Sequence, residues 1–158
     1  MSFSTYLASA RQVAETEKEV LDLLHSKAVQ TGALDKIEIR AAWASMQSII
    51  ENAIGKARRI LKNYDCPLVP TRARDALVIM HDTGLLSDDM YQSLMSAVGF
   101  RNAMIHDYMN FDEKVLLGIL AQKKYLDIYD FLLKEPDYNS VQFRRIESYT
   151  LGIDKPCP

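Results

Sequence analysis

Cysteine, glycine and proline are scarce in this sequence: its 158 residues include two Cys, six Gly and five Pro. Cys66 and Cys157 lie far apart, with no CxxC pair and no histidine at a metal-binding spacing. This pattern argues against a disulfide scaffold and against a cysteine zinc site. We therefore expect two free thiols in a reducing, cytoplasmic environment.

Long hydrophobic runs are also lacking. The longest strongly apolar run covers residues 115–121, far short of the ~20 residues that a membrane span needs. The opening residues have no basic stretch followed by an apolar one, so we expect neither a signal peptide nor a membrane anchor.

An excess of charge of one sign is absent as well. The chain has 19 Lys and Arg against 21 Asp and Glu, for a formal net charge of −2. A protein that coats nucleic acid by bulk positive charge is therefore excluded, because nothing drives that attraction. With 48% hydrophobic and 25% charged residues, the composition is that of a folded globular protein.

Helical periodicity dominates the sequence, and strand patterns are nearly absent. Apolar residues recur at three- and four-residue steps in two long segments, from Phe3 to Ala28 and from about Leu34 to Asn63. Gly32 suits the end of the first helix. The second carries two adjacent apolar stripes, one through Trp43 and one that includes Ile37, so we expect it to be a central, broadly buried helix.

Capping residues place three further helices. Thr71 is the expected N-cap of a short third helix, and Ser87 that of a fourth, which runs into the segment after Arg101. Asp112 is the expected cap of a fifth helix, which Glu135 and Pro136 end. The sequence thus predicts one all-α domain over residues 1–136, an up-and-down bundle of about five helices. Residues 137–158 form a C-terminal extension with no clear pattern.

The segment that carries chemistry-bearing side chains in this otherwise ordinary pattern is 101–108. On a regular helix at ~100° per residue, Arg101 and Tyr108 share a face. Asn102 and His106 are four residues apart and can hydrogen-bond, which would orient the imidazole. Arg101 and His106 diverge by ~140°. Either the helix loosens near His106, or a second copy of the chain brings the two groups together.

The combination of arginine and histidine has a definite chemical use. A guanidinium binds phosphate bidentately, and an imidazole can take a proton from a ribose 2′-hydroxyl or deliver one to a leaving 5′-oxygen. Together they suffice for RNA cleavage without a metal ion. We expect no metal and no cofactor. The alternative is structural, since cationic side chains at a helix C-terminus also satisfy its dipole and free carbonyls.

Residues 99–102 and 106–108 resemble the R-x4-H-x-Y signature of HEPN-domain toxins of the HepT type. The resemblance extends from about residue 34 to 134, with the motif in its usual place before the final helix. It implies a helical homodimer in which two motifs face each other across a cleft and act as a metal-independent ribonuclease.

The resemblance also implies roles for the residues of the motif. Arg101 would bind and stabilise the scissile phosphate, and His106 would be the acid and base. Tyr108 occupies the position that a nucleotidyltransferase antitoxin, MntA-like, adenylylates in a type VII-like toxin–antitoxin pair. Asn102 and Asp107 also fall inside the signature and would have supporting roles at most, Asn102 by orienting His106, while Asp107 is either supporting or simply solvated.

Six basic residues against one acidic residue, Asp65, give residues 56–74 a local charge of +5. They form either an RNA-facing or partner-facing surface or simply a solvated helix face. They are Lys56, Arg58, Arg59, Lys62, Arg72 and Arg74.

Two other functions remain open at this stage. Related helical proteins act as non-catalytic, substrate-binding or regulatory partners of a small nucleotidyltransferase, and a purely structural helical dimer is the third alternative. The intact R-x4-H-x-Y spacing favours the ribonuclease.

Overall fold

The computed structural model describes residues 1–107 and 110–149. Within these residues the chain forms seven helices and no strand, so the all-α prediction is confirmed and the expected number of five helices is wrong. In chain order the helices are α1 (Phe3–Thr31), α2 (Lys36–Asn63), α3 (Ala73–Asp82), α4 (Asp88–His106), α5 (Glu113–Ala121), α6 (Tyr125–Leu133) and α7 (Ser140–Glu147).

The two long helices α1 and α2 pack on each other, joined by a short turn in which Gly32 has a φ of 69°. A capping box then starts α2: the Asp35 carboxylate accepts from the Glu38 backbone N–H at 2.8 Å, and the Glu38 carboxylate accepts from the Asp35 N–H at 2.9 Å. The breadth of the buried face of α2 is as predicted, although Ile37 at its start is 79% exposed.

Two sequence-based helix assignments need correction. Arg72, not Thr71, is the N-cap of α3, and its side chain makes no capping hydrogen bond. The expected fifth helix is two helices, α5 and α6, because Lys123 adopts a φ of 51° and ends the first. Ser87 and Asp112 cap α4 and α5 as predicted.

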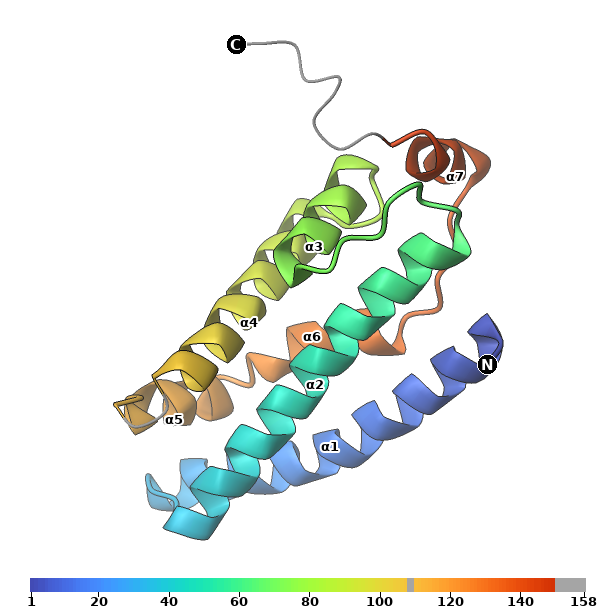
Figure 1. The fold of residues 1–158 in the computed structure, drawn as a ribbon. Helices are drawn as coiled ribbons and strands as arrows, with labels where there is room; N and C mark the ends of the chain where they lie inside the picture. The colour runs from blue at the N-terminus through green and yellow to red at the C-terminus, as the bar shows by residue number, and fades with distance from the viewer. Residues whose placement is uncertain (108–109, 150–158) are drawn as a thin grey trace.

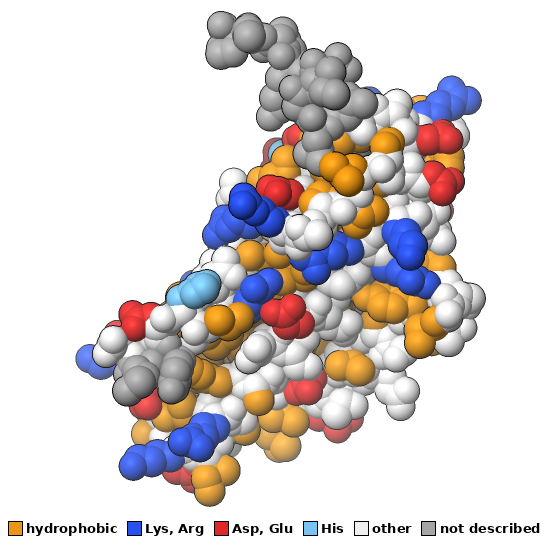
Figure 2. Space-filling view, viewed as in Figure 1, with side chains coloured by type: hydrophobic (Ala, Val, Ile, Leu, Met, Phe, Trp, Pro, Cys, Tyr) orange, Lys and Arg blue, Asp and Glu red, His pale blue; other side chains and the backbone are white. Residues whose placement is uncertain are grey.

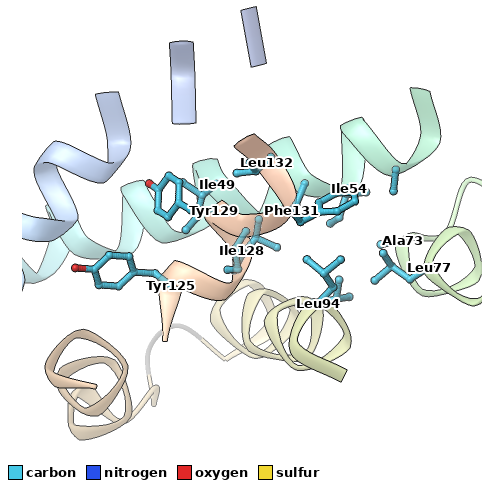
Figure 3. Close-up of a cluster of buried hydrophobic side chains, with 14 of the residues drawn as sticks. Ile49, Ile54, Ala73, Leu77, Leu94, Tyr125, Ile128, Tyr129, Phe131 and Leu132 are labelled. Carbon is cyan, nitrogen blue, oxygen red and sulfur yellow. The ribbon is translucent and has the colours of Figure 1, made fainter. Parts of the chain in front are cut away.

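The short helix α6 occupies the middle of the bundle, where it contacts α1, α2 and α4 (Figure 1). Its apolar residues belong to one core cluster with Ile49 of α2, Leu94 of α4 and Leu77 of α3 (Figure 3). Tyr125 and Tyr129 are fully buried, and the Tyr125 hydroxyl donates a 2.7 Å hydrogen bond to Asp22 of α1. This core therefore fixes how α2 and α4 lie relative to each other.

The segment after Pro136, which the sequence left unassigned, contains α7. A capping box of Asn139 and Gln142 starts this helix, and Ile146 is fully buried. Its Gln142 side chain donates to the Gly84 carbonyl at 2.8 Å, in the turn between α3 and α4. Helix α7 thus packs on the end of the bundle (Figure 1).

Lys56 of α2 is buried at the C-terminal end of α6, with 2% of its surface exposed. Its ammonium group donates to the backbone carbonyls of Phe131, Leu132 and Lys134 at 2.8, 3.0 and 2.5 Å. These are terminal helix carbonyls, which have no partner within α6 and which the helix dipole makes favourable for a cation. The predicted surface role of Lys56 in RNA binding is wrong, because the amine is enclosed by protein.

No helix in the described part of the chain is both long enough and apolar enough to cross a membrane.

Burial of Lys56 predicts an unusual pH dependence of stability. Desolvation lowers the pKa of Lys56 to about 8 in the folded chain, against ~10.4 in the unfolded chain. Between these values the unfolded state binds more protons, so rising pH stabilises the fold. Between pH 7 and 9.5, the free energy of unfolding of the wild type, measured in urea, should rise by about 1–2 kcal/mol more than that of Lys56→Met. Parallel pH profiles for the two proteins would contradict this.

Candidate functional site

The helix that carries Arg101 and His106 stays regular up to its end. α4 ends at His106, and Asp107 is its C-cap, with φ −138° and ψ 38°. The Asp107 N–H still donates to the Ala103 carbonyl at 3.0 Å. Five residues apart on a regular helix, Arg101 and His106 diverge by ~140°. The helix does not loosen before His106, so one chain alone does not bring these two side chains together.

Arg101 lies against α2, where its Nε is 3.1 Å from Oε1 of Glu51. The Arg101 side chain is 20% exposed and the Glu51 side chain 47%. The Nε atom is buried, and although the carboxylate is within ion-pair distance, the Nε–H is not aligned with it for a hydrogen bond. Neither Nη atom has a hydrogen bond or ion pair with a described residue. The outer edge of the guanidinium is therefore available for an anion.

Sequence reasoning missed Glu51. The available signal was its isolation, since it is the only acidic residue between Glu38 and Asp65. A lone carboxylate in a mostly apolar helix needs a partner or water. Which cation serves as that partner follows from the packing of α2 on α4, and the sequence alone does not give it.

His106 is exposed, and it makes no hydrogen bond to any described residue. The predicted hydrogen bond between Asn102 and His106 is therefore not formed, and Asn102 is only partly exposed. Asp107 accepts a 3.0 Å hydrogen bond from the Asn110 side chain. Tyr108 lies outside the described residues.

Three aromatic rings hold the segment after α4 against the bundle. Phe111 meets Trp43 of α2 edge to face, with ring centroids 5.0 Å apart. It meets Phe100 of α4 in the same way at 5.3 Å. These contacts connect the end of α4 to the helix that carries Glu51.

The six predicted basic residues do not form one surface. Besides the buried Lys56, Arg58 donates to the Thr71 carbonyl, while Arg59 donates to the Met1 carbonyl at 2.6 Å and lies over the Tyr6 ring. Lys62, Arg72 and Arg74 are exposed. Figure 2 shows basic side chains spread over the face formed by α2, α3 and α4, with acidic side chains among them.

Of the exposed basic residues, Arg74 is the one placed against α4. Its Nη2 atom lies 3.3 Å from where a Cβ on Gly99 would be, so the absence of a side chain at Gly99 admits the guanidinium. Gly99 is two residues before Arg101. A second cation therefore lies close to the helix that carries the candidate site.

A cavity of about 570 Å³ opens on another side of α4, between it and α5 and α6. Phe100, Ile119 and Met46 supply apolar lining, and Ser93 donates to Asp127 there at 3.2 Å. Neither Arg101 nor His106 lines it. In the described residues no group of three or more His, Cys, Asp or Glu side chains is arranged to hold a metal ion.

Comparisons with known proteins point to one family. Residues 9–135 match the family described as Ribonuclease HepT-like. A tri-AMPylated HEPN toxin of Shewanella oneidensis, solved in complex with MNT antitoxin, superposes with a TM-score of 0.71 at 17% identity and covers 84% of this chain and 96% of its own.

Two further solved structures are similar. A toxin–antitoxin with AMP-PNP has a TM-score of 0.71 at 16% identity, over 84% of this chain and 97% of that one. A mutant MntA–HpeT toxin–antitoxin has a TM-score of 0.69 at 16% identity, over 81% and 95%. At these identities the likeness shows a shared fold. No curated protein sequence matches the chain.

The aromatic contacts predict that Phe111 holds the end of α4 in place. Phe111→Ala should destabilise the fold by about 2–3 kcal/mol, since a partly buried ring is lost. In hydrogen exchange, the amides of residues 103–107 should exchange faster, while those of α1 should keep their rates. Phe143→Ala, which removes a similar ring contact from α7, is the matched control and should leave residues 103–107 unchanged. Equal exchange at the end of α4 in the two variants would contradict the assignment.

Proposed function

The chain belongs to the Ribonuclease HepT-like family, and from this premise we propose that it is a metal-independent endoribonuclease, the toxin of a type VII-like toxin–antitoxin pair. Arg101 binds the scissile phosphate, and His106 moves the proton. What carries the proposal is the placement of both side chains on the last two turns of α4, with the outer edge of Arg101 open and His106 exposed.

The reaction needs one proton removed and one delivered. The ribose 2′-oxygen attacks phosphorus as its hydroxyl proton leaves, and the bond to the 5′-oxygen breaks as that oxygen gains a proton. Negative charge grows on the phosphoryl oxygens in between, and the open Nη edge of a guanidinium stabilises it. Arginine and histidine thus cover the requirements of the step.

The geometry of α4 favours a site made by two copies of the chain. Arg101 faces α2 and His106 is exposed about 140° away, so a cleft between two-fold related copies is needed to bring Arg101 of one copy near His106 of the other. Each such site then pairs one guanidinium with one imidazole, which accepts the proton from the 2′-hydroxyl and delivers it to the 5′-oxygen.

Neutralisation is proposed to follow from modification of Tyr108 by an MntA-like nucleotidyltransferase. The similar solved structures are complexes with such an antitoxin, and one of them is AMPylated. Tyr108 is two residues after His106. An added AMP brings bulk and a negative phosphate into a cleft that must accept RNA, which repels the substrate. Arg74, beside Gly99, is the best placed of the outlying cations to contact a neighbouring RNA phosphate.

Mixing two inactive variants tests both the residues and the shared cleft. His106→Ala and Arg101→Ala should each lower metal-free cleavage of an RNA oligonucleotide by at least about 100-fold, since general acid–base catalysis and phosphate binding are lost. Refolding the two variants together in equal amounts should restore up to about a quarter of wild-type activity, because half of the dimers then have one complete site.

Full activity of His106→Ala would refute its catalytic role, and mixed dimers without activity would refute a site shared between copies. A wild type that binds a nucleotidyltransferase and its ligand but leaves RNA intact would instead support the alternative, a non-catalytic partner of that enzyme.

Tyr108→Phe separates toxicity from neutralisation. The variant should arrest growth as the wild type does, because the phenolic oxygen has no role in the cleavage step, but co-expression of the nucleotidyltransferase should no longer rescue growth. Mass spectrometry should find the wild type heavier by AMP and the variant unmodified. Rescue of the variant together with an unchanged AMP mass would place the modification elsewhere.

A further inference from the structure

Glu51 has no part in the chemistry proposed above, yet its carboxylate is the acidic group closest to the phosphate-binding arginine. Resting on the proposed function, we propose that Glu51 is a positioning residue that holds Arg101 by its inner edge and opposes the binding of RNA in the ground state. The juxtaposition of Glu51 Oε1 and Arg101 Nε, at 3.1 Å, is the observation behind it.

The edge of the guanidinium that Glu51 contacts decides which N–H groups of Arg101 remain open to an RNA phosphate. The carboxylate lies at Nε, which is sealed from solvent against α2. A phosphate therefore cannot approach through that edge. It can approach through the edge formed by Nη1 and Nη2, which binds two phosphoryl oxygens in parallel. Glu51 thus selects an orientation in which the planar fork presents its bidentate edge.

Nothing in the described structure gives Glu51 another purpose. Its side chain is 47% exposed and has no other hydrogen bond or ion pair to a described residue. The N-terminal capping of α2 is performed by Asp35 and Glu38, four turns away along the helix. The Glu51 carboxylate is itself half exposed, so solvent screens its ion pair with Arg101 and the pair contributes little to stability. Removing the carboxylate should therefore leave the fold intact.

A carboxylate at this distance from the guanidinium also repels an incoming phosphate. Removing its charge should therefore strengthen RNA binding. Removing its contact with Arg101 should slow the chemical step, because that step depends on a fixed orientation of the guanidinium. The two effects have opposite signs. A residue that only stabilises the fold would move binding and catalysis in the same direction or move neither.

The experiment measures binding and catalysis separately. Affinity for an RNA oligonucleotide is measured in the His106→Ala background, where the RNA is not consumed, with and without Glu51→Gln. Removal of the charge should lower the dissociation constant by about threefold, and this gain in affinity should disappear when Arg101→Ala is also present. Glu19→Gln, which removes an exposed carboxylate from α1, is the matched control and should leave affinity unchanged.

Catalysis is measured with His106 intact. Glu51→Ala should lower kcat by about tenfold without raising KM, and Glu51→Asp should restore part of that loss. The melting temperatures of all variants should stay close to that of the wild type.

The outcomes separate this proposal from the ribonuclease assignment. Suppose that the wild type cleaves RNA. If Glu51→Ala then leaves kcat unchanged, or Glu51→Gln binds RNA more weakly, the role of Glu51 is overturned and the ribonuclease assignment stands. Tighter binding by Glu51→Gln to a protein that does not cleave RNA overturns the ribonuclease and keeps Glu51 as the residue opposing Arg101. Absence of RNA binding by the wild type overturns both.

Discussion

The position of α2 against α6 depends on a buried ammonium group. Lys56 brings its charge to three carbonyls at the end of α6, which have no partner within the helix, and Arg11 of α1 donates to the neighbouring Leu133 carbonyl. Burying a charge this deeply is unfavourable unless its partners are in place, so the contact fixes one register of α2 against α6. Because Glu51 and Trp43 precede Lys56 on the same helix, the position of α2 also determines what these two side chains can reach.

The candidate site inherits its geometry from that register. Trp43 and Glu51 both extend from α2 toward α4, Trp43 to Phe111 and Glu51 to Arg101. The core cluster around Tyr129 and Leu94 holds α4 at the distance at which these contacts form. The orientation of Arg101 is thus a consequence of helix packing.

The sequence could predict those features that depend on neighbouring residues of the chain, such as the position of a helix. Periodicity and caps located most of the helices, because Ser87 and Asp112 act on their own helix. The break at Lys123 was missed because a left-handed non-glycine residue leaves no compositional mark. Lys56 was wrongly assigned to the surface because its partners are backbone carbonyls of α6, 75 or more residues away, which no side-chain pattern reveals. Glu51 was missed for the same reason, its partner being set by tertiary packing.

The spacing of Arg101 and His106 is best understood from the geometry of the α-helix. A separation of four or seven residues would put both groups on one face and allow a complete site in one chain, whereas five places them on different faces. The chain keeps the helix regular through His106, so it does not correct this divergence by local unwinding. In the dimer that we propose, a two-fold axis beside the end of α4 would bring Arg101 of one copy close to His106 of the other. Under the proposed function, the spacing that leaves one chain incomplete is therefore the spacing that makes cleavage depend on assembly.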